Sequence, residues 1–208
     1  MDERKVGRRN KAGTGLLVLV AVLSFISVPA KTEATGAITG TVRARGVKNP
    51  TDVVVYIEKV QGQFQPPNSP VQIDQIKRAY VPHVLAVLVG TEIEFLNSDN
   101  ELHNVHARQN RRELFNIGIP PQRKSRRILK EEGVVTLLCD VHPEMSAFIV
   151  VTQNPFFAKT DEKGNYMIEN VPPGAYKLGA WHEKLKPESK EVKVAEGSKV
   201  VVDFELRP

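Results

Sequence analysis

Apolar and polar residues alternate along most of the chain, which is the pattern of β-strands that bury one face. The predicted strands lie at 37–44, 52–58, 71–76, 166–171, 176–181, 191–194 and 200–206, and 84–95 is predicted to contain two strands and a turn. Segments rich in glycine, proline, asparagine and aspartate separate them, as at 46–50, 160–165 and 172–174. No sustained helical periodicity follows the N-terminal leader, so the sequence predicts an all-β protein.

The first 34 residues have the pattern of a targeting segment. A basic lead at 1–11 precedes an apolar run at 16–28, which at about 13 residues is short for a bilayer span. Either Val28-Pro29-Ala30 or Thr32-Glu33-Ala34 fits the cleavage site of a secretory signal peptide. We therefore expect an exported protein, periplasmic or extracellular. The alternative is an uncleaved segment that anchors the protein to a membrane.

Charge restricts the kinds of partner. The whole chain has a formal net charge of +5. The basic lead at 1–11 holds five basic side chains against two acidic ones, and Lys31 and Glu33 cancel, so the exported protein would carry only about +2, which does not indicate nucleic-acid binding. A strongly basic stretch remains at 108–130, where Glu113 is the only acidic residue. We predict a solvated loop there, with a short strand and turn at 113–121. The alternative is a docking surface for an acidic redox partner or an anionic surface.

The most distinctive stretch of the chain lies between two apolar runs, at 134–151. Cys139, His142 and Met145 follow one another there at intervals of three residues, and His103 lies upstream in a polar loop. A thiolate, two imidazoles and a weak axial thioether are the donors that suit a blue-copper site. Cys139 is the only cysteine. A single thiol in an oxidising compartment is explained by metal ligation or, alternatively, by burial as an inert side chain.

The order of motifs in this region resembles a known family. The motifs are PHVL, GTEIEF, NSD, HNV and CDVHPEM, at 82–85, 90–95, 97–99, 103–105 and 139–145. Together they resemble the cupredoxins, above all plastocyanin- and amicyanin-like proteins, including those often labelled methylamine-utilisation proteins. The resemblance covers roughly 63–153 and implies a Greek-key β-sandwich with one type 1 copper ion.

The same resemblance implies a role for individual residues. His103, Cys139 and His142 would be the equatorial ligands of copper, and Met145 the axial ligand. Asn104 should tie the two ligand loops together by hydrogen bonds. Pro143 would stiffen the loop between His142 and Met145.

A second resemblance concerns the C-terminal part. The segments TDEKGNY at 160–166 and NVPPGAY at 170–176 resemble carboxypeptidase regulatory-like (transthyretin-like) domains. Such domains usually open with strands like those at 38–42 and 53–57, which here precede the cupredoxin segment. We therefore predict a small β-sandwich split between 35–62 and 154–208, with the cupredoxin domain at 63–153 inserted into it. Two domains in tandem are the alternative.

The chain has three further histidines. His83 and His106 are alternatives for further metal ligands or for residues on the electron path, although neither is expected to have such a role. His106 lies three residues from His103, so in an extended strand their side chains would face opposite sides. His182, which follows Trp181, is expected to be structural or to lie at the domain interface.

We expect a copper protein that carries single electrons between redox partners of unknown identity. The alternatives are a copper carrier or storage protein, a metal-free β binding module, and a structural zinc site built from His103, His106, Cys139 and His142. The sequence has no Gly-x-Ser-x-Gly, Walker, His-Glu-x-x-His or haem-attachment motif. Four protein ligands would also leave no open position for a substrate, so an enzyme is not expected.

Overall fold

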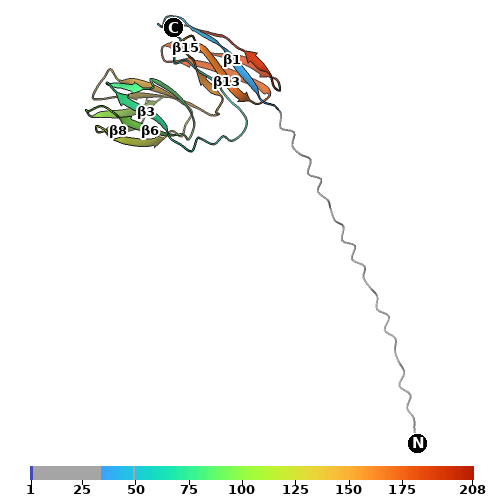
Figure 1. The fold of residues 1–208 in the computed structure, drawn as a ribbon, viewed down its shortest axis with the longest axis horizontal. Helices are drawn as coiled ribbons and strands as arrows, with labels where there is room; N and C mark the ends of the chain where they lie inside the picture. The colour runs from blue at the N-terminus through green and yellow to red at the C-terminus, as the bar shows by residue number, and fades with distance from the viewer. Residues whose placement is uncertain (2–33, 49) are drawn as a thin grey trace. The chain divides into compact units, whose positions relative to one another are not determined.

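The computed structural model describes residue 1, residues 34–48 and residues 50–208 (Figure 1). The chain divides into two units, Met1–Thr32 and Glu33–Pro208, and the fold belongs to the second. The predicted signal peptide or anchor, at 1–34, lies almost wholly outside the described residues. Among the residues that are described, no helix is long and apolar enough to cross a membrane.

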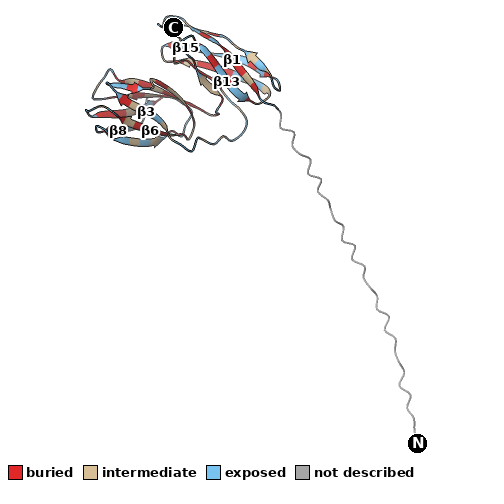
Figure 2. Ribbon diagram, in the orientation of Figure 1, coloured by how far each residue is buried: buried red, intermediate tan, exposed pale blue. Residues whose placement is uncertain are grey.

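The described part of the chain is built from seventeen β-strands, which confirms the predicted all-β class. In chain order they are β1 (Gly36–Ala44), β2 (Val54–Ile57), β3 (Val71–Ile76), β4 (Ala79–Val81), β5 (Val84–Leu88), β6 (Glu92–Asn97), β7 (His103–Gln109), β8 (Arg112–Ile119), β9 (Lys124–Ile128), β10 (Gly133–Leu138), β11 (Ser146–Thr152), β12 (Phe157–Lys159), β13 (Asn165–Val171), β14 (Gly174–His182), β15 (Leu185–Val194), β16 (Lys199–Val201) and β17 (Phe204–Leu206). Buried and exposed residues alternate along many of them, as the sequence pattern predicted (Figure 2).

One pair of sheets joins the first strands of the fold to the last. Strand β1 pairs with β13 on one side and with β16 and β17 on the other, and β2 lies between β12 and β14 in a sheet that ends at β15. Side chains from both sheets form one apolar core that includes Ile38, Ile57, Ile168 and Leu178. Strands on either side of 71–152 therefore share sheets. The domain boundaries at 62/63 and 153/154 stay a prediction.

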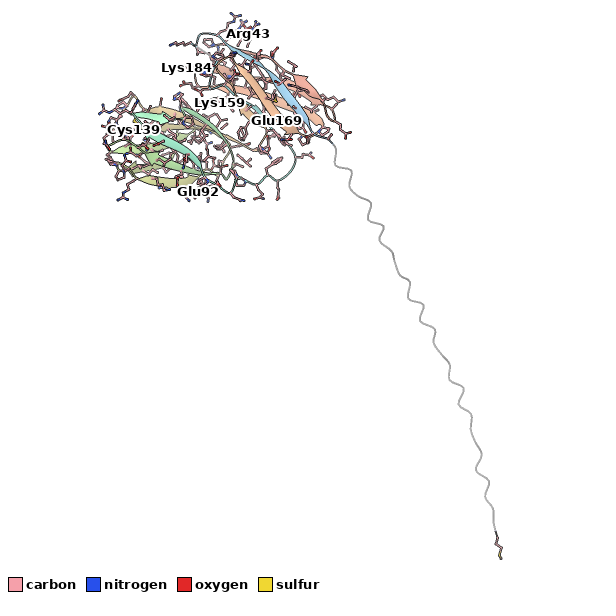
Figure 3. The ribbon with its side chains drawn as sticks, viewed as in Figure 1. Arg43, Glu92, Cys139, Lys159, Glu169 and Lys184 are labelled. Carbon is pink, nitrogen blue, oxygen red and sulfur yellow. The ribbon has the colours of Figure 1, made fainter. Side chains whose placement is uncertain are left out.

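The other pair of sheets lies within 71–152 and holds the candidate ligands. Its strand orders are β5-β11-β10-β7-β8 and β4-β3-β6-β9, with parallel pairs between β5 and β11 and between β3 and β6. Apolar side chains of both sheets, among them Phe95, Val105 and Ile149, form a second core. Crossover connections between the two sheets produce this non-sequential order, so this part of the chain is a two-sheet β-sandwich, as the sequence resemblance implied. Cys139 lies in this sandwich (Figure 3).

Within the basic segment 108–130, the predicted short strand at 113–121 corresponds to β8, whereas the solvated loop predicted around it is wrong at 124–128, which forms β9. Strand β8 pairs with β7, and β9 pairs with β6 at the edge of the opposite sheet. The five residues of β9 alternate between exposed and half-buried, but three of them are basic and Ile128 is exposed, so the sequence showed no apolar period of two. Part of the charge is also neutralised, because Lys124 and Arg126 both contact the Glu94 carboxylate.

Candidate metal centre

Two neighbouring strand ends bring the predicted ligands together. His103 is the first residue of β7, and Cys139 directly follows β10, which pairs with β7. The loop from Cys139 to Met145 closes on itself, because the Cys139 N–H donates to the carbonyl of Met145 and the Met145 N–H donates to that of His142. His103, Cys139 and Met145 are buried, whereas 13% of the His142 side chain is exposed.

The ligand atoms of His103, Cys139 and His142 converge. Nδ1 of His103 lies 2.9 Å from Nδ1 of His142, and Sγ of Cys139 lies 3.9 Å from the same His142 nitrogen. All three ligand atoms lie within 4.8 Å of one another. Metal–nitrogen bonds of about 2 Å would place two ligand nitrogens at roughly this separation. Met145 packs in the same core as Cys139, at the end of the shared loop.

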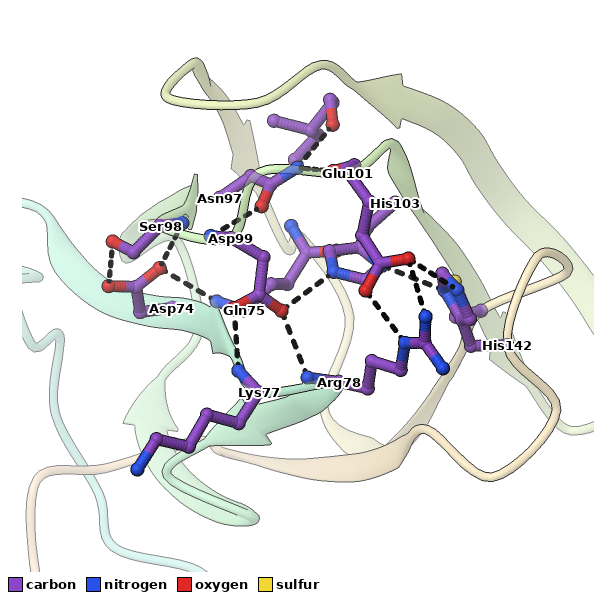
Figure 4. A network of polar contacts seen from close by, with 12 residues as sticks. Asp74, Gln75, Lys77, Arg78, Asn97, Ser98, Asp99, Glu101, His103 and His142 are labelled. Carbon is purple, nitrogen blue, oxygen red and sulfur yellow. Dashed lines mark hydrogen bonds and ion pairs between the residues drawn. The ribbon is translucent and has the colours of Figure 1, made fainter.

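The far nitrogens of the two rings face carboxylates (Figure 4). Nε2 of His103 lies 2.9 Å from Oδ2 of Asp99, and Nε2 of His142 lies 3.2 Å from Oε2 of Glu101. When each ring carries its proton on Nε2, both Nδ1 atoms direct lone pairs toward each other. A cation between them would convert that repulsion into ligation. The donor set therefore fits a metal ion.

Asn104 connects β7 to the ligand loop. Its Oδ1 accepts the N–H of Asp140 at 2.7 Å and the thiol of Cys139 at 3.3 Å, and its Nδ2 donates to Asn116 and Asp140. A metal-bound thiolate has no proton to donate, so only the bonds to Asn116 and Asp140 would persist in a loaded site. Pro143 lies exposed in the same loop.

The sequence analysis did not identify Tyr80, whose hydroxyl group contacts the backbone of both strands that carry the candidate ligands. Its Oη lies 2.6 Å from the carbonyl oxygen of Asn104 and 3.0 Å from that of Leu138. Burial raises the pKa of Tyr80, so the hydroxyl keeps its proton and remains a donor at ordinary pH. The aromatic residue in the short strand β4 gave no signal of this role, because the contact joins segments far apart in the chain.

His106 lies outside the converging group. Its Nδ1 is 2.9 Å from Asp140 Oδ1, and its Nε2 is 3.0 Å from Glu113 Oε2, in a geometry that suits an ion pair better than a hydrogen bond. The hydrogen bond from His106, followed by that from Asn116, lowers the pKa of Asp140. The strand-face argument is consistent with this placement, which takes away one of the four ligands of the zinc alternative.

The remaining histidines also lie outside the group. Nδ1 of His83 is 3.0 Å from the carbonyl of Ser146, and its Nε2 is 3.0 Å from Glu183 Oε1. His182 is buried at the end of β14, where its Nδ1 accepts the N–H of Lys184 and burial lowers its pKa. Neither contact brings an imidazole to Cys139.

Comparison with known proteins bears first on the C-terminal part. The family model for the carboxypeptidase regulatory-like domain matches residues 133–207. The match takes in nearly all of 154–208 and also β10 and β11 of the other sandwich. No curated protein sequence matches the chain.

Solved structures similar to this chain include a cupredoxin, an amicyanin and a Cu-containing nitrite reductase. One is a novel purple cupredoxin from Nitrosopumilus maritimus, at 24% identity, covering 39% of this chain and 99% of that one with a TM-score of 0.37. A reduced mutant of amicyanin has 24% identity, covers 41% of this chain and 84% of its own, and has a TM-score of 0.38. A Cu-containing nitrite reductase from Thermus scotoductus SA-01 has 22% identity, covers 47% of this chain and 25% of its own, and has a TM-score of 0.39. Likenesses this distant carry no argument about function.

The chain therefore holds two β-sandwiches, and residues 133–207, which include most of the C-terminal strands, match the family model of the carboxypeptidase regulatory-like domain. What the site can do rests on its own geometry.

Proposed function

We propose that the protein is an exported type 1 copper protein that carries single electrons between redox partners. The observation that carries this proposal is the convergence of His103 Nδ1, His142 Nδ1 and Cys139 Sγ within 4.8 Å. Met145 closes the same loop as a buried thioether. Copper bound there would supply one-electron redox chemistry.

The donor types favour copper over zinc. A thiolate, two imidazoles and a thioether form the set typical of blue-copper sites, whereas structural zinc is held by four Cys or His ligands. His106 is occupied by Asp140 and Glu113, so the group offers three zinc-type ligands rather than four.

The surroundings favour a carrier of electrons. The ligands stand at the ends of paired strands, and the hydrogen bonds of Asn104 hold the loop against β7. A site held in this way changes its geometry little between two oxidation states, which rapid electron transfer requires. Four protein ligands would leave no coordination position on copper open to a substrate, so we propose an electron carrier and not an enzyme.

His142 is the ligand through which electrons would leave. Its side chain reaches the surface, and two apolar side chains of the adjoining loops, Leu102 and Val141, are 50% and 49% exposed. Exposed apolar residues that neighbour His103 and His142 in the chain, beside the charged pair of Glu101 and Arg78, suit a brief contact with another redox protein. The identity of that partner is not fixed by these residues. The proposal of export is supported by the sequence pattern of 1–34 alone, and membrane anchoring through that segment is the alternative.

The test is the visible absorption spectrum of the full chain titrated with Cu(II). We expect an intense blue band that Cys139→Ser lacks and that the matched control His106→Gln retains, because His106 lies on the same strand outside the group. Tight zinc binding with no blue band would contradict the proposal.

A second measurement distinguishes an electron carrier from a copper carrier or storage protein. An electron carrier retains its ion through repeated reduction and reoxidation by small mediators, and the blue band disappears and returns. Loss of Cu(I) to a chelator after a single reduction would favour the carrier or storage function instead.

A further inference from the structure

The edge of His142 that faces away from the ligand group is covered by an ion pair. Glu101, in the loop between β6 and β7, places Oε2 3.2 Å from His142 Nε2. Arg78, in the turn between β3 and β4, donates to both oxygens of that carboxylate, from Nε at 2.7 Å and from Nη2 at 2.9 Å. Glu101 is therefore shared between an imidazole and a guanidinium (Figure 4).

The position of Arg78 is fixed by its own backbone. The N–H groups of Lys77 and Arg78 donate to the Asp99 carboxylate at 2.6 and 2.9 Å, and both residues adopt the left-handed conformation. A turn held in this way presents the guanidinium in one place, and its planar fork matches a carboxylate at two points.

We propose that Glu101, held by Arg78, is a positioning residue that orients His142 and tunes the affinity of the site for oxidised copper. This inference rests on the proposed function. An ionised acceptor at Nε2 fixes the ring proton there, which leaves Nδ1 free to face Cys139 and His103. The same hydrogen bond makes the ring a stronger electron donor, which stabilises Cu(II) more than Cu(I).

Two features determine how much the loss of the Glu101–His142 contact should change the affinity for copper. The side chains of Arg78 and Glu101 are 54% and 39% exposed, so water screens part of their charge. The hydrogen bond itself is local to the ring. We therefore expect the lower end of the range for partners of metal-bound histidines, about a tenfold change in affinity.

The experiment compares Glu101→Gln with the matched control Glu144→Gln in the copper-loaded full chain. Glu144 is an exposed carboxylate of the ligand loop, so its loss removes the same charge near the site but leaves the His142 contact intact. We expect Glu101→Gln to raise the reduction potential by about 59 mV, the one-electron equivalent of a tenfold weaker preference for Cu(II). The control should move it by less than half as much. Equal shifts in the two variants, or none in Glu101→Gln, would overturn the inference while leaving the blue-copper function standing.

A second readout needs no metal. Nitrogen-15 NMR of the metal-free chain reports which nitrogen of His142 carries the proton. We expect a proton on Nε2 of His142 in the parent chain, faster exchange of that proton with water in Arg78→Lys, and partial loss of the Nε2 proton in Glu101→Gln. A parent chain in which Nε2 of His142 carries no proton would overturn the inference even if the protein binds no copper at all.

Discussion

Oδ2 of Asp99 lies 2.9 Å from Nε2 of His103, and the same carboxylate accepts N–H groups from Lys77 and Arg78. Burial alone would raise the pKa of Asp99, but the hydrogen bonds from Arg78, Lys77 and His103 outweigh it and lower that pKa. The carboxylate is therefore ionised and accepts the ring proton of a fully buried histidine. His103 is thereby held with its Nδ1 toward the ligand group.

Replacement of Asp99 by asparagine should weaken copper binding by about 10- to 100-fold, the range typical for partners of metal-bound histidines. An amide can present its NH₂ group to Nε2, which favours the wrong tautomer of His103. Competition with a chelator of known affinity measures the change. Asp74→Asn is the control, because Asp74 contacts Ser98 and no histidine among its described partners. Unchanged affinity in Asp99→Asn would show that packing alone orients His103.

The converging group of His103, Cys139 and His142 could be predicted from the sequence, because soft donors at three-residue steps between apolar runs match the ligand types of a blue-copper site. The carboxylates that contact the two histidines could not be predicted. Asp99 and Glu101 look like ordinary loop acids, and they become partners of histidines only through the β3–β4 turn. That turn is made by Lys77 and Arg78 at φ of 52° and 57°, without the glycine or asparagine that usually indicates such a conformation.

The same limit applies to the strands. Alternation predicted most of them, because one face of each is buried. Strand β9 was missed because three of its five residues are basic and its apolar neighbours are few. Its place is set by pairing with β6, a non-local relation that no short window of sequence contains.

Asn104→Ala should destabilise the metal-free protein by roughly 1–3 kcal/mol, because this buried side chain accepts hydrogen bonds from the Asp140 N–H and the Cys139 thiol and donates to two further side chains. The N–H of Asp140 loses its acceptor, and the ligand loop loses its link to β7. Urea unfolding monitored by tryptophan fluorescence gives the free energy of unfolding. Asn100→Ala, an exposed residue of a neighbouring loop, should change it by no more than about 0.5 kcal/mol. Equal effects of the two substitutions would refute the role of Asn104 as a link between the loops.

Stability at acid pH should depend on Glu94. This side chain is only 3% exposed, and contacts with Lys124, Arg126 and Gln72 lower its pKa to about 2. The folded pKa lies below the unfolded value, so the contribution is complete above about pH 4.5 and is lost as the pH falls toward 2. Thermal unfolding between pH 7 and pH 2.5 should therefore show a shallower acid decline for Glu94→Gln than for the parent chain. Glu92→Gln, at a more exposed position, should retain the parent decline.

Met145→Leu separates the copper and zinc alternatives. The side chain is buried in the core beside Cys139, and the substitution nearly conserves its volume, so it should cost at most about 1.5 kcal/mol of stability. In a blue-copper site the axial thioether donates weakly to Cu(II), and the reduction potential depends on that ligand. Its removal should raise the potential and keep the blue band, because the equatorial ligands remain. A structural zinc ion is bound by Cys and His side chains and not by a thioether, so the affinity for zinc should barely change.

Potentiometry of the copper-loaded variant and a zinc competition titration measure the two effects. A large loss of zinc affinity with no change in potential would make Met145 a zinc-site residue and remove the basis for electron transfer.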